Sequence, residues 1–127
     1  MKDIIAVVGL GYVGLPLVIE FGKKFKTIGY DINKKRINDL ISKNDVTGEL
    51  STYDLDENPN IIFTSDLEEI KCANFYIIAV PTPIDKKNKP DLSILFKATK
   101  DVGGLINKND IIIFESTVYP GCTEEEC

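Results

Sequence analysis

Histidine and tryptophan are absent from this chain of 127 residues, and methionine occurs only once. The lack of histidine removes the commonest general base and the commonest zinc ligand of proteins, and we expect no metal site. The three cysteines, Cys72, Cys122 and Cys127, are odd in number and form no Cys-x-x-Cys pair. This usage favours a reducing, cytoplasmic setting over a disulfide framework, and Cys72 is expected to be a small buried hydrophobe.

Long hydrophobic runs and an excess of positive charge are also lacking. The apolar runs are only a few residues long, far short of the roughly 20 that span a membrane. The opening residues, Met1 to Asp3, lead directly into an apolar segment, so we expect no signal peptide. The net charge of −5 disfavours nucleic acid or an anionic membrane as the main partner. We therefore expect one globular domain, residues 1–127, that binds neither.

The chain does contain a regular alternation of β-branched segments with segments of helical period. This alternation predicts an α/β fold, a Rossmann-like doubly wound parallel sheet. Asn33 and Asp91 are expected helix N-caps, and Ser65 begins a capping box. With five predicted strands and a last helix that has only begun, we expect a fragment truncated before its last strand. The predicted strands are 3–8, 26–30, 61–64, 75–80 and 110–114, and the predicted helices are 12–24, 33–43, a short one after 65, 91–106 and one starting at 123.

Three glycines follow the first predicted strand in the pattern Gly-x-Gly-x-x-Gly. In this context Gly9 permits a tight turn, Gly11 lets the backbone approach a pyrophosphate, and Gly14 lets the helix pack closely on the strand. The helix N-terminus adds amide groups and a partial positive charge. The alternative is a glycine-rich connector without a ligand.

A carboxylate, Asp31, ends the second predicted strand at the position that accepts hydrogen bonds from an adenosine ribose. Its charge opposes the additional phosphate of NADP, so NAD is the expected cofactor. Arg36 is expected to lie along the adenine face or the ribose edge. The alternatives are a helix-capping role for Asp31 and a solvated helix position for Arg36.

Four segments together carry a resemblance to a known family. They are "GLGYVGLPL" from Gly9, "SDLEE" from Ser65, "VPTPID" from Val80 and "ESTVYPGCTEEEC" from Glu115. The chain resembles, over essentially its whole length, the N-terminal NAD-binding domain of the UDP-glucose/GDP-mannose dehydrogenase family. The last segment is most similar to the branch that oxidises UDP-N-acetylhexosamines for bacterial surface polysaccharides. The last two segments argue against a 2-hydroxy-acid or hydroxyisobutyrate dehydrogenase.

The resemblance implies an oxidoreductase that converts the C6 alcohol of a UDP-sugar, UDP-N-acetylglucosamine or UDP-N-acetylgalactosamine, to the uronic acid with two NAD+. Tyr12 and Val13 would contact the pyrophosphate, while Asp31 and Arg36 would hold the adenosine side. The resemblance also implies roles for two threonines: Thr82 would contact the cofactor near its ribose or phosphates, and Thr117 would lie near the nicotinamide and help place the reacting sugar or a catalytic water.

Both threonines follow predicted strands, where ligands bind in open α/β sheets. The alternative for each is a turn hydroxyl bonded to its own backbone.

The remaining catalytic groups implied by the resemblance, a cysteine, a lysine and a glutamate, are expected beyond Cys127. Cys122 has no basic neighbour that would activate it, and the acids Glu124 to Glu126 suit the first turn of a helix better than a metal. The fragment alone is expected to be inactive, its UDP-sugar being bound by a missing domain of a full-length homodimer or higher oligomer. The alternative function is a stand-alone NAD-binding regulatory module without catalysis.

Overall fold

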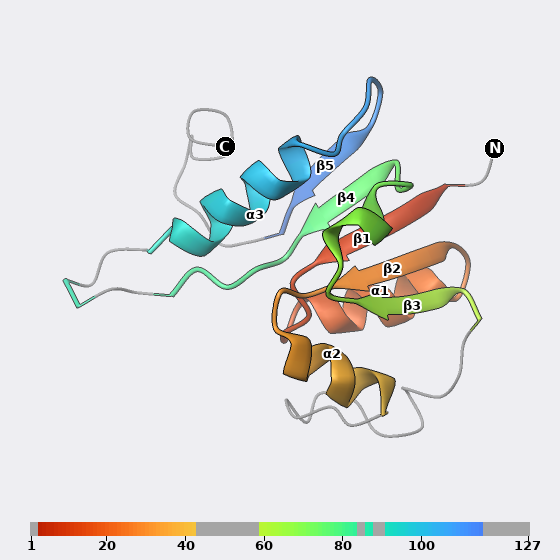
Figure 1. Ribbon diagram of the computed structural model, residues 1–127, viewed down its shortest axis with the longest axis horizontal. Helices are drawn as coiled ribbons and strands as arrows, with labels where there is room; N and C mark the ends of the chain where they lie inside the picture. Colours follow the sequence, from red (N-terminus) through yellow and green to blue (C-terminus); the bar gives the residue numbers. More distant parts are fainter. Residues whose placement is uncertain (1–2, 43–58, 84–85, 88–90, 116–127) are drawn as a thin grey trace.

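The computed structural model describes residues 3–42, 59–83, 86–87 and 91–115 as a sheet of five strands with helices on both faces (Figure 1). The strands are β1 (Ile4–Val8), β2 (Lys26–Tyr30), β3 (Ile61–Thr64), β4 (Phe75–Ile78) and β5 (Ile111–Phe114). The helices are α1 (Gly14–Gly22), α2 (Lys34–Ile41), the short 3₁₀ helix η1 (Leu67–Ile70) and α3 (Ser93–Gly103).

The strands are all parallel and lie in the order β3-β2-β1-β4-β5. The chain builds outward from β1 to β3 and then crosses back to place β4 on the other side of β1. Val8, at the end of β1, is therefore in register with Tyr30 on one side and Ile78 on the other. This order confirms the predicted Rossmann-like fold, and its reversal beside β1 creates the crevice in which such sheets bind ligands.

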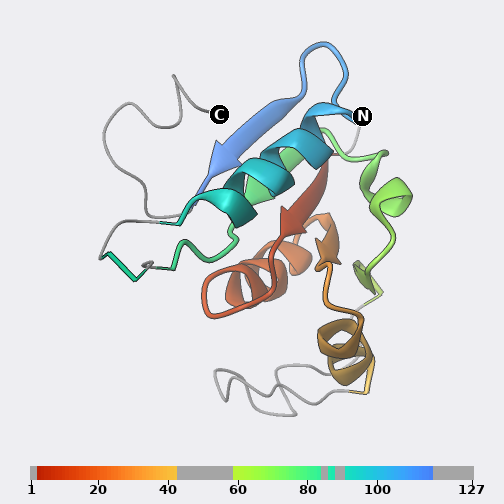
Figure 2. The ribbon, with the colours of Figure 1, turned by 60° about the vertical axis from the view of Figure 1, so that its left-hand side comes forward.

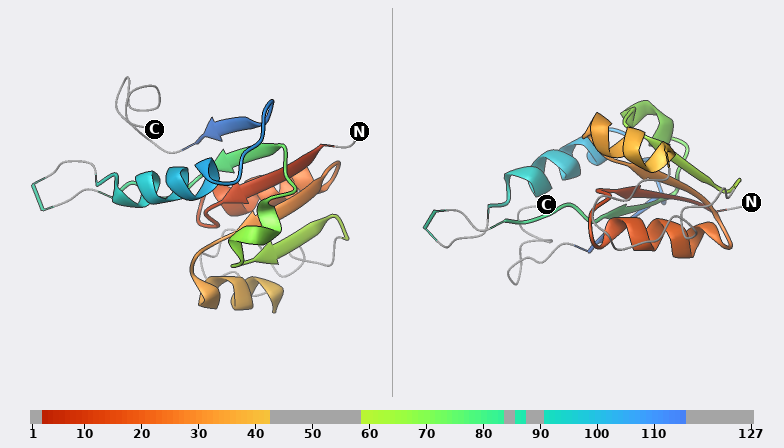
Figure 3. Two further views of the ribbon diagram at one scale, coloured as in Figure 1. Left: turned by 45° about the horizontal axis from the view of Figure 1, so that its top comes forward. Right: turned by 90° about the horizontal axis from the view of Figure 1, so that it is seen from below.

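Each face of the sheet has its own apolar core. One core joins β1 and β4 to α1 and α2, and the other joins β1, β2 and β4 to η1 and α3. Figures 2 and 3 show α1 and α3 on opposite faces. β1 lies between the two cores, and Ala6 and Val7 are completely buried. Its continuous apolar sequence is explained by this burial on both sides.

Several local predictions are confirmed and others need correction. Asn33 caps α2 as predicted, because its side chain accepts hydrogen bonds from the amides of Lys35 and Arg36. The cap of η1 is Asp66 and not Ser65, since the Asp66 carboxylate accepts from Glu68 N. The prediction that Cys72 is buried is wrong: this residue is exposed, beyond the end of η1.

Asn74 joins three strands at the edge of the sheet opposite the glycine turn. Its side-chain oxygen accepts from Ile4 N at 2.8 Å, and its side-chain nitrogen donates to the Asp3 carboxylate at 2.9 Å. Its backbone donates to Ile4 O and accepts from Ile111 N, both at 3.0 Å. One residue thus links the starts of β1, β4 and β5.

We expect Asn74→Ala to lower the free energy of unfolding by about 1–3 kcal/mol, because the Ile4 amide loses its acceptor in a partly buried place. Urea unfolding followed by circular dichroism measures this change. Asn107→Ala is the control, because Asn107 is exposed and its two bonds with Asp110 use only its backbone amide and carbonyl. Equal stability of the two variants would contradict the assigned role.

Candidate functional site

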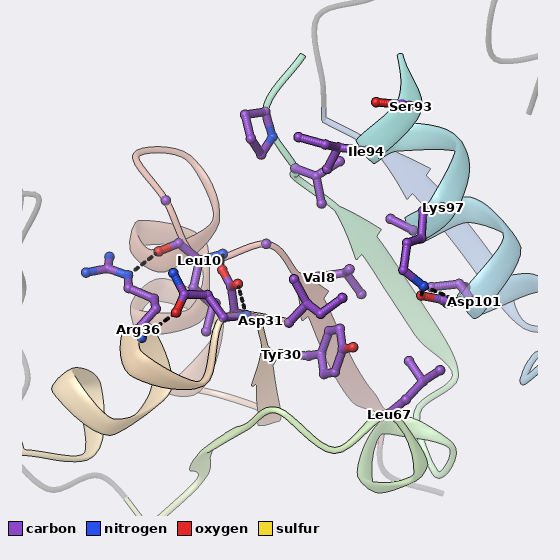
Figure 4. Close-up of a pocket in the computed structure, with 18 residues that line it drawn as sticks. Val8, Leu10, Tyr30, Asp31, Arg36, Leu67, Ser93, Ile94, Lys97 and Asp101 are labelled. Atoms are coloured by element: carbon purple, nitrogen blue, oxygen red, sulfur yellow. Dashed lines mark hydrogen bonds and ion pairs between the residues drawn. The ribbon is translucent and has the colours of Figure 1, made fainter. Parts of the chain in front are cut away.

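The candidate site is a pocket of about 630 Å³ at the carboxyl ends of β1, β2 and β4 (Figure 4). The glycine turn after β1 and the start of α2 form one wall, and the inner face of α3 forms the other. Val80 and Pro81, which follow β4, also line it. The pocket therefore occupies the crevice at which the sheet order reverses.

Gly9 makes the tight turn that the sequence predicts. Its φ of +101° is a conformation that side-chain-bearing residues rarely adopt. A Cβ on Gly9 would lie 2.9 Å from the backbone of Ala79 and Val80, so the end of β4 approaches it closely. The Gly9 amide donates to Tyr30 O at 2.9 Å, which ties the turn to β2 as well.

The other two glycines differ in what a side chain would meet. A Cβ on Gly14 would overlap the carbonyl oxygen of Gly9, so this position allows α1 to start directly behind the turn. A Cβ on Gly11 would meet nothing within 4 Å, and Gly11 lines the pocket. The open space over Gly11 is therefore available to a ligand. The next residues, Tyr12 and Val13, are 67% and 49% exposed.

Asp31 and Arg36 hold the glycine turn at the two peptide groups of Leu10. One oxygen of Asp31 accepts from Leu10 N at 3.0 Å, and the other accepts from Asn33 N at 2.9 Å. Nε of Arg36 donates to Leu10 O at 2.8 Å, and the Arg36 residue is only 7% exposed. The idea that Arg36 is a solvated helix residue is therefore wrong. We name this arrangement the Leu10 clamp, and sequence spacing gave no sign of it because its partners are far apart in the chain.

The wall formed by α3 carries charged groups that sequence reasoning missed. Nζ of Lys97 lies 3.1 Å from the Asp101 carboxylate, and both residues line the pocket. The i, i+4 spacing of this pair was visible in the sequence, but nothing there placed it opposite β2. Tyr30 lines the same region, and burial, followed by the charge of Asp101, raises the pKa of its hydroxyl above the ordinary value.

The remaining predicted positions are only partly covered. Thr82 follows Pro81, which lines the pocket, but is not itself a lining residue. Thr117, Cys122, Cys127 and Glu124 to Glu126 lie outside the described residues. Among the residues that the structure describes, no group of three acidic, cysteine or histidine side chains is arranged to hold a metal ion. In the same ranges, no helix has the length and apolar character needed to cross a membrane.

Comparison with known proteins agrees with this geometry. The model of the UDP-glucose/GDP-mannose dehydrogenase family, NAD binding domain, matches residues 3–127. The chain belongs to this family. Because the matched unit is the family's NAD-binding domain, the cofactor of this domain is NAD. The glycine turn, its open approach over Gly11 and the adjacent Asp31 form the corresponding pocket.

Individual relatives of the UDP-glucose/GDP-mannose dehydrogenase family are similar over almost the whole chain. A UDP-N-acetyl-D-glucosamine 6-dehydrogenase from Salmonella typhi is 55% identical over 97% of this chain, and Protein CapL from Staphylococcus aureus is 58% identical over 100%. The solved UDP-D-ManNAc dehydrogenase from Pyrococcus horikoshii superposes over 96% of this chain with a TM-score of 0.88 and 35% identity. The chain spans only 29 to 30% of the length of these three proteins.

Proposed function

We propose that this chain is the NAD-binding domain of a UDP-N-acetylhexosamine 6-dehydrogenase, which oxidises the C6 alcohol of UDP-N-acetylglucosamine or UDP-N-acetylgalactosamine to the uronic acid with two NAD+. The observation that carries the proposal is the glycine turn, which leaves open space over Gly11 and is flanked by the Asp31 carboxylate. The choice of sugar is supported by the higher identity to the Salmonella glucosamine enzyme than to the Pyrococcus mannosamine enzyme.

The residues present fit a dinucleotide at this pocket. Gly11 offers backbone without a side chain, and the N-cap of α1, Val13, provides no side-chain acceptor for the Gly14 amide. Of the next two residues, Leu15 donates its amide to Gly11 O and Pro16 has no N–H. The Gly14 amide, at the positive end of the helix, suits a phosphate oxygen, which accepts a hydrogen bond and carries the complementary charge. The residues that we assign to the cofactor are Gly9, Gly11, Tyr12, Val13, Gly14, Asp31, Arg36, Thr82 and Thr117.

Each group has a distinct task in this proposal. The turn holds the pyrophosphate, and Asp31 accepts from the adenosine ribose while its clamp fixes the turn. Arg36 acts on the cofactor through Leu10, whose carbonyl it holds. Thr117 helps place the reacting sugar or a catalytic water near the nicotinamide. When bound, NAD+ supplies the acceptor for the hydride that leaves C6.

The remaining chemistry requires groups that we place outside this chain. Loss of the C6 hydroxyl proton needs a base, and oxidation to the carboxylate needs a nucleophile that traps the aldehyde. We assign these roles to a lysine, a glutamate and a cysteine in the rest of the full-length enzyme. The same part of the protein binds the UDP-sugar and forms the homodimer or larger oligomer, in the cytoplasm.

We expect this chain alone to bind NAD but not to form NADH with any of UDP-N-acetylglucosamine, UDP-N-acetylgalactosamine or UDP-glucose. General acid–base help is worth about 10²–10⁴-fold, and positioning by a second domain is worth several kcal/mol more. Calorimetric titration measures binding, and NADH absorbance measures turnover by the chain and by the full-length protein. Full-length protein that binds NAD and oxidises none of the three sugars would support a regulatory module instead. Turnover by the chain alone that disappears in Cys122→Ser would refute the proposal that the catalytic nucleophile lies outside this chain.

A further inference from the structure

The hydroxyl of Tyr30 is a polar group for which the described residues provide no hydrogen-bond partner. Tyr30 ends β2, is only 7% exposed and lines the pocket. Its ring lies between Val8 and Leu67, and its hydroxyl points toward α3 (Figure 4). The ring is buried, but the hydroxyl oxygen is open to the pocket, so a polar atom of a ligand can reach it as its hydrogen-bond partner.

Asp101 stands opposite Tyr30 on the inner face of α3 and lines the same pocket. Its side chain is 26% exposed, and the ion pair with Lys97 orients its carboxylate. Burial and, after it, the charge of Asp101 raise the pKa of the Tyr30 hydroxyl, which therefore remains protonated at neutral pH. The pocket thus presents one hydrogen-bond donor, Tyr30, and one acceptor, Asp101, on facing walls.

The position of these groups relative to Asp31 indicates which part of a ligand they meet. Tyr30 directly precedes Asp31, whose carboxylate we assign to the ribose. A base attached to that ribose would extend from the end of β2 toward α3, where Ile94 and Val80 provide apolar surface. Its polar edge would then reach the Tyr30 and Asp101 pair.

We infer that Tyr30 and Asp101 determine the specificity of this site for adenine: Asp101 accepts from the exocyclic amino group, and Tyr30 donates to an adjacent ring nitrogen. The inference rests on the proposed function, because it requires an adenine dinucleotide in the pocket. Adenine presents an amino donor beside ring-nitrogen acceptors. Hypoxanthine has a carbonyl oxygen in place of the amino group, so the Asp101 carboxylate would face another acceptor. Such mismatches of buried polar groups discriminate more strongly than differences in apolar fit.

The test compares NAD with nicotinamide hypoxanthine dinucleotide by calorimetric titration of this chain. We expect the hypoxanthine analogue to bind at least about tenfold more weakly, as loss of a hydrogen bond to a charged group implies. Asp101→Asn should bring the two affinities to within about threefold, since an amide can also donate to the carbonyl oxygen. Tyr30→Phe should lower the affinity for NAD by about tenfold, because it removes the hydroxyl and leaves the aromatic ring in place.

Two matched variants control for changes in charge and in packing. Glu20→Gln removes a carboxylate from another ion pair on a helix, 2.9 Å from Lys23 and remote from the pocket lining. Tyr76→Phe removes a hydroxyl from a core tyrosine that bonds Lys71 O instead. Both should keep the parent preference for adenine, and the unfolding midpoints of all variants confirm that they fold.

The outcomes separate this inference from the proposed function. If NAD binds but the hypoxanthine analogue binds equally well, the adenine-specific role is wrong and the proposed function stands. The adenine-specific role is also wrong, and the proposed function stands, if Asp101→Asn prefers NAD over the hypoxanthine analogue as strongly as the parent chain does. If the parent chain binds neither dinucleotide, both proposals are overturned.

Discussion

Gly11→Val is expected to abolish NAD binding and to leave the fold intact. The two parts of this result have separate reasons. A Cβ on Gly11 would meet no protein atom within 4 Å, so we expect the folded chain to accommodate a side chain there. The space that it fills faces the pocket, where a pyrophosphate must approach the backbone of the turn. Calorimetric titration measures the loss of binding, and thermal unfolding followed by circular dichroism measures the fold.

Gly103→Val is the matched control, since a Cβ there also meets nothing within 4 Å, but Gly103 ends α3 and is not itself a lining residue of the pocket. This variant should bind NAD as the parent does. A Gly11→Val protein with normal NAD affinity would exclude the glycine turn as the pyrophosphate site. A Gly11→Val protein that fails to fold would contradict the open space that the structure shows.

NAD is expected to bind about a hundredfold more tightly than NADP, and Asp31→Asn should reduce this preference. A carboxylate roughly 5 Å from one phosphate charge, at an effective dielectric constant of about 20, costs about 3 kcal/mol. The asparagine removes the charge and keeps one oxygen, which can still accept from Leu10 N. We therefore expect the affinity for NADP to rise in this variant.

Comparison of Asp31→Ala with Asp31→Asn distinguishes the effect of the Asp31 charge from the effect of its hydrogen bonds in the Leu10 clamp. It removes the acceptors of both Leu10 N and Asn33 N, so the affinities for both dinucleotides should fall while their ratio narrows. Asp39→Asn, on α2 and outside the pocket lining, controls for the change in net charge. Equal or tighter binding of NADP by the parent chain would remove Asp31 as the determinant of cofactor choice.

The elements of this fold were predictable because they depend on local sequence. Strands β2 and β3 have the predicted bounds, since each is a compact apolar or β-branched segment between polar ones. The tight turn at Gly9 followed from its position between a strand and a helix. The exposure of Cys72 could not be predicted from local sequence. This residue follows the short helix η1 and belongs to no strand or helix whose periodic pattern would indicate burial.

The parts of the site that were missed depend on contacts between distant segments. Arg36 reaches Leu10 only because α2 packs beside the turn, and no spacing rule connects the two residues. Tyr30 and Asp101 line one pocket only because β2 and α3 contribute to the same core on one face of the sheet. Such pairs can be recognised only when the topology is known, whereas the glycine pattern is contained in the six consecutive residues from Gly9 to Gly14.

The Leu10 clamp also makes the glycine turn and α2 one cooperative unit. Asp31 holds the amide of Leu10, and Arg36, within α2, holds its carbonyl. Local opening of α2 would therefore release the turn from one side and lower the population that can bind a dinucleotide. By the same linkage, a bound dinucleotide slows the fraying of α2 and protects its amides from hydrogen exchange. Cofactor affinity in this domain is thus set partly by the stability of a helix that follows the phosphate-binding turn at a distance in the chain.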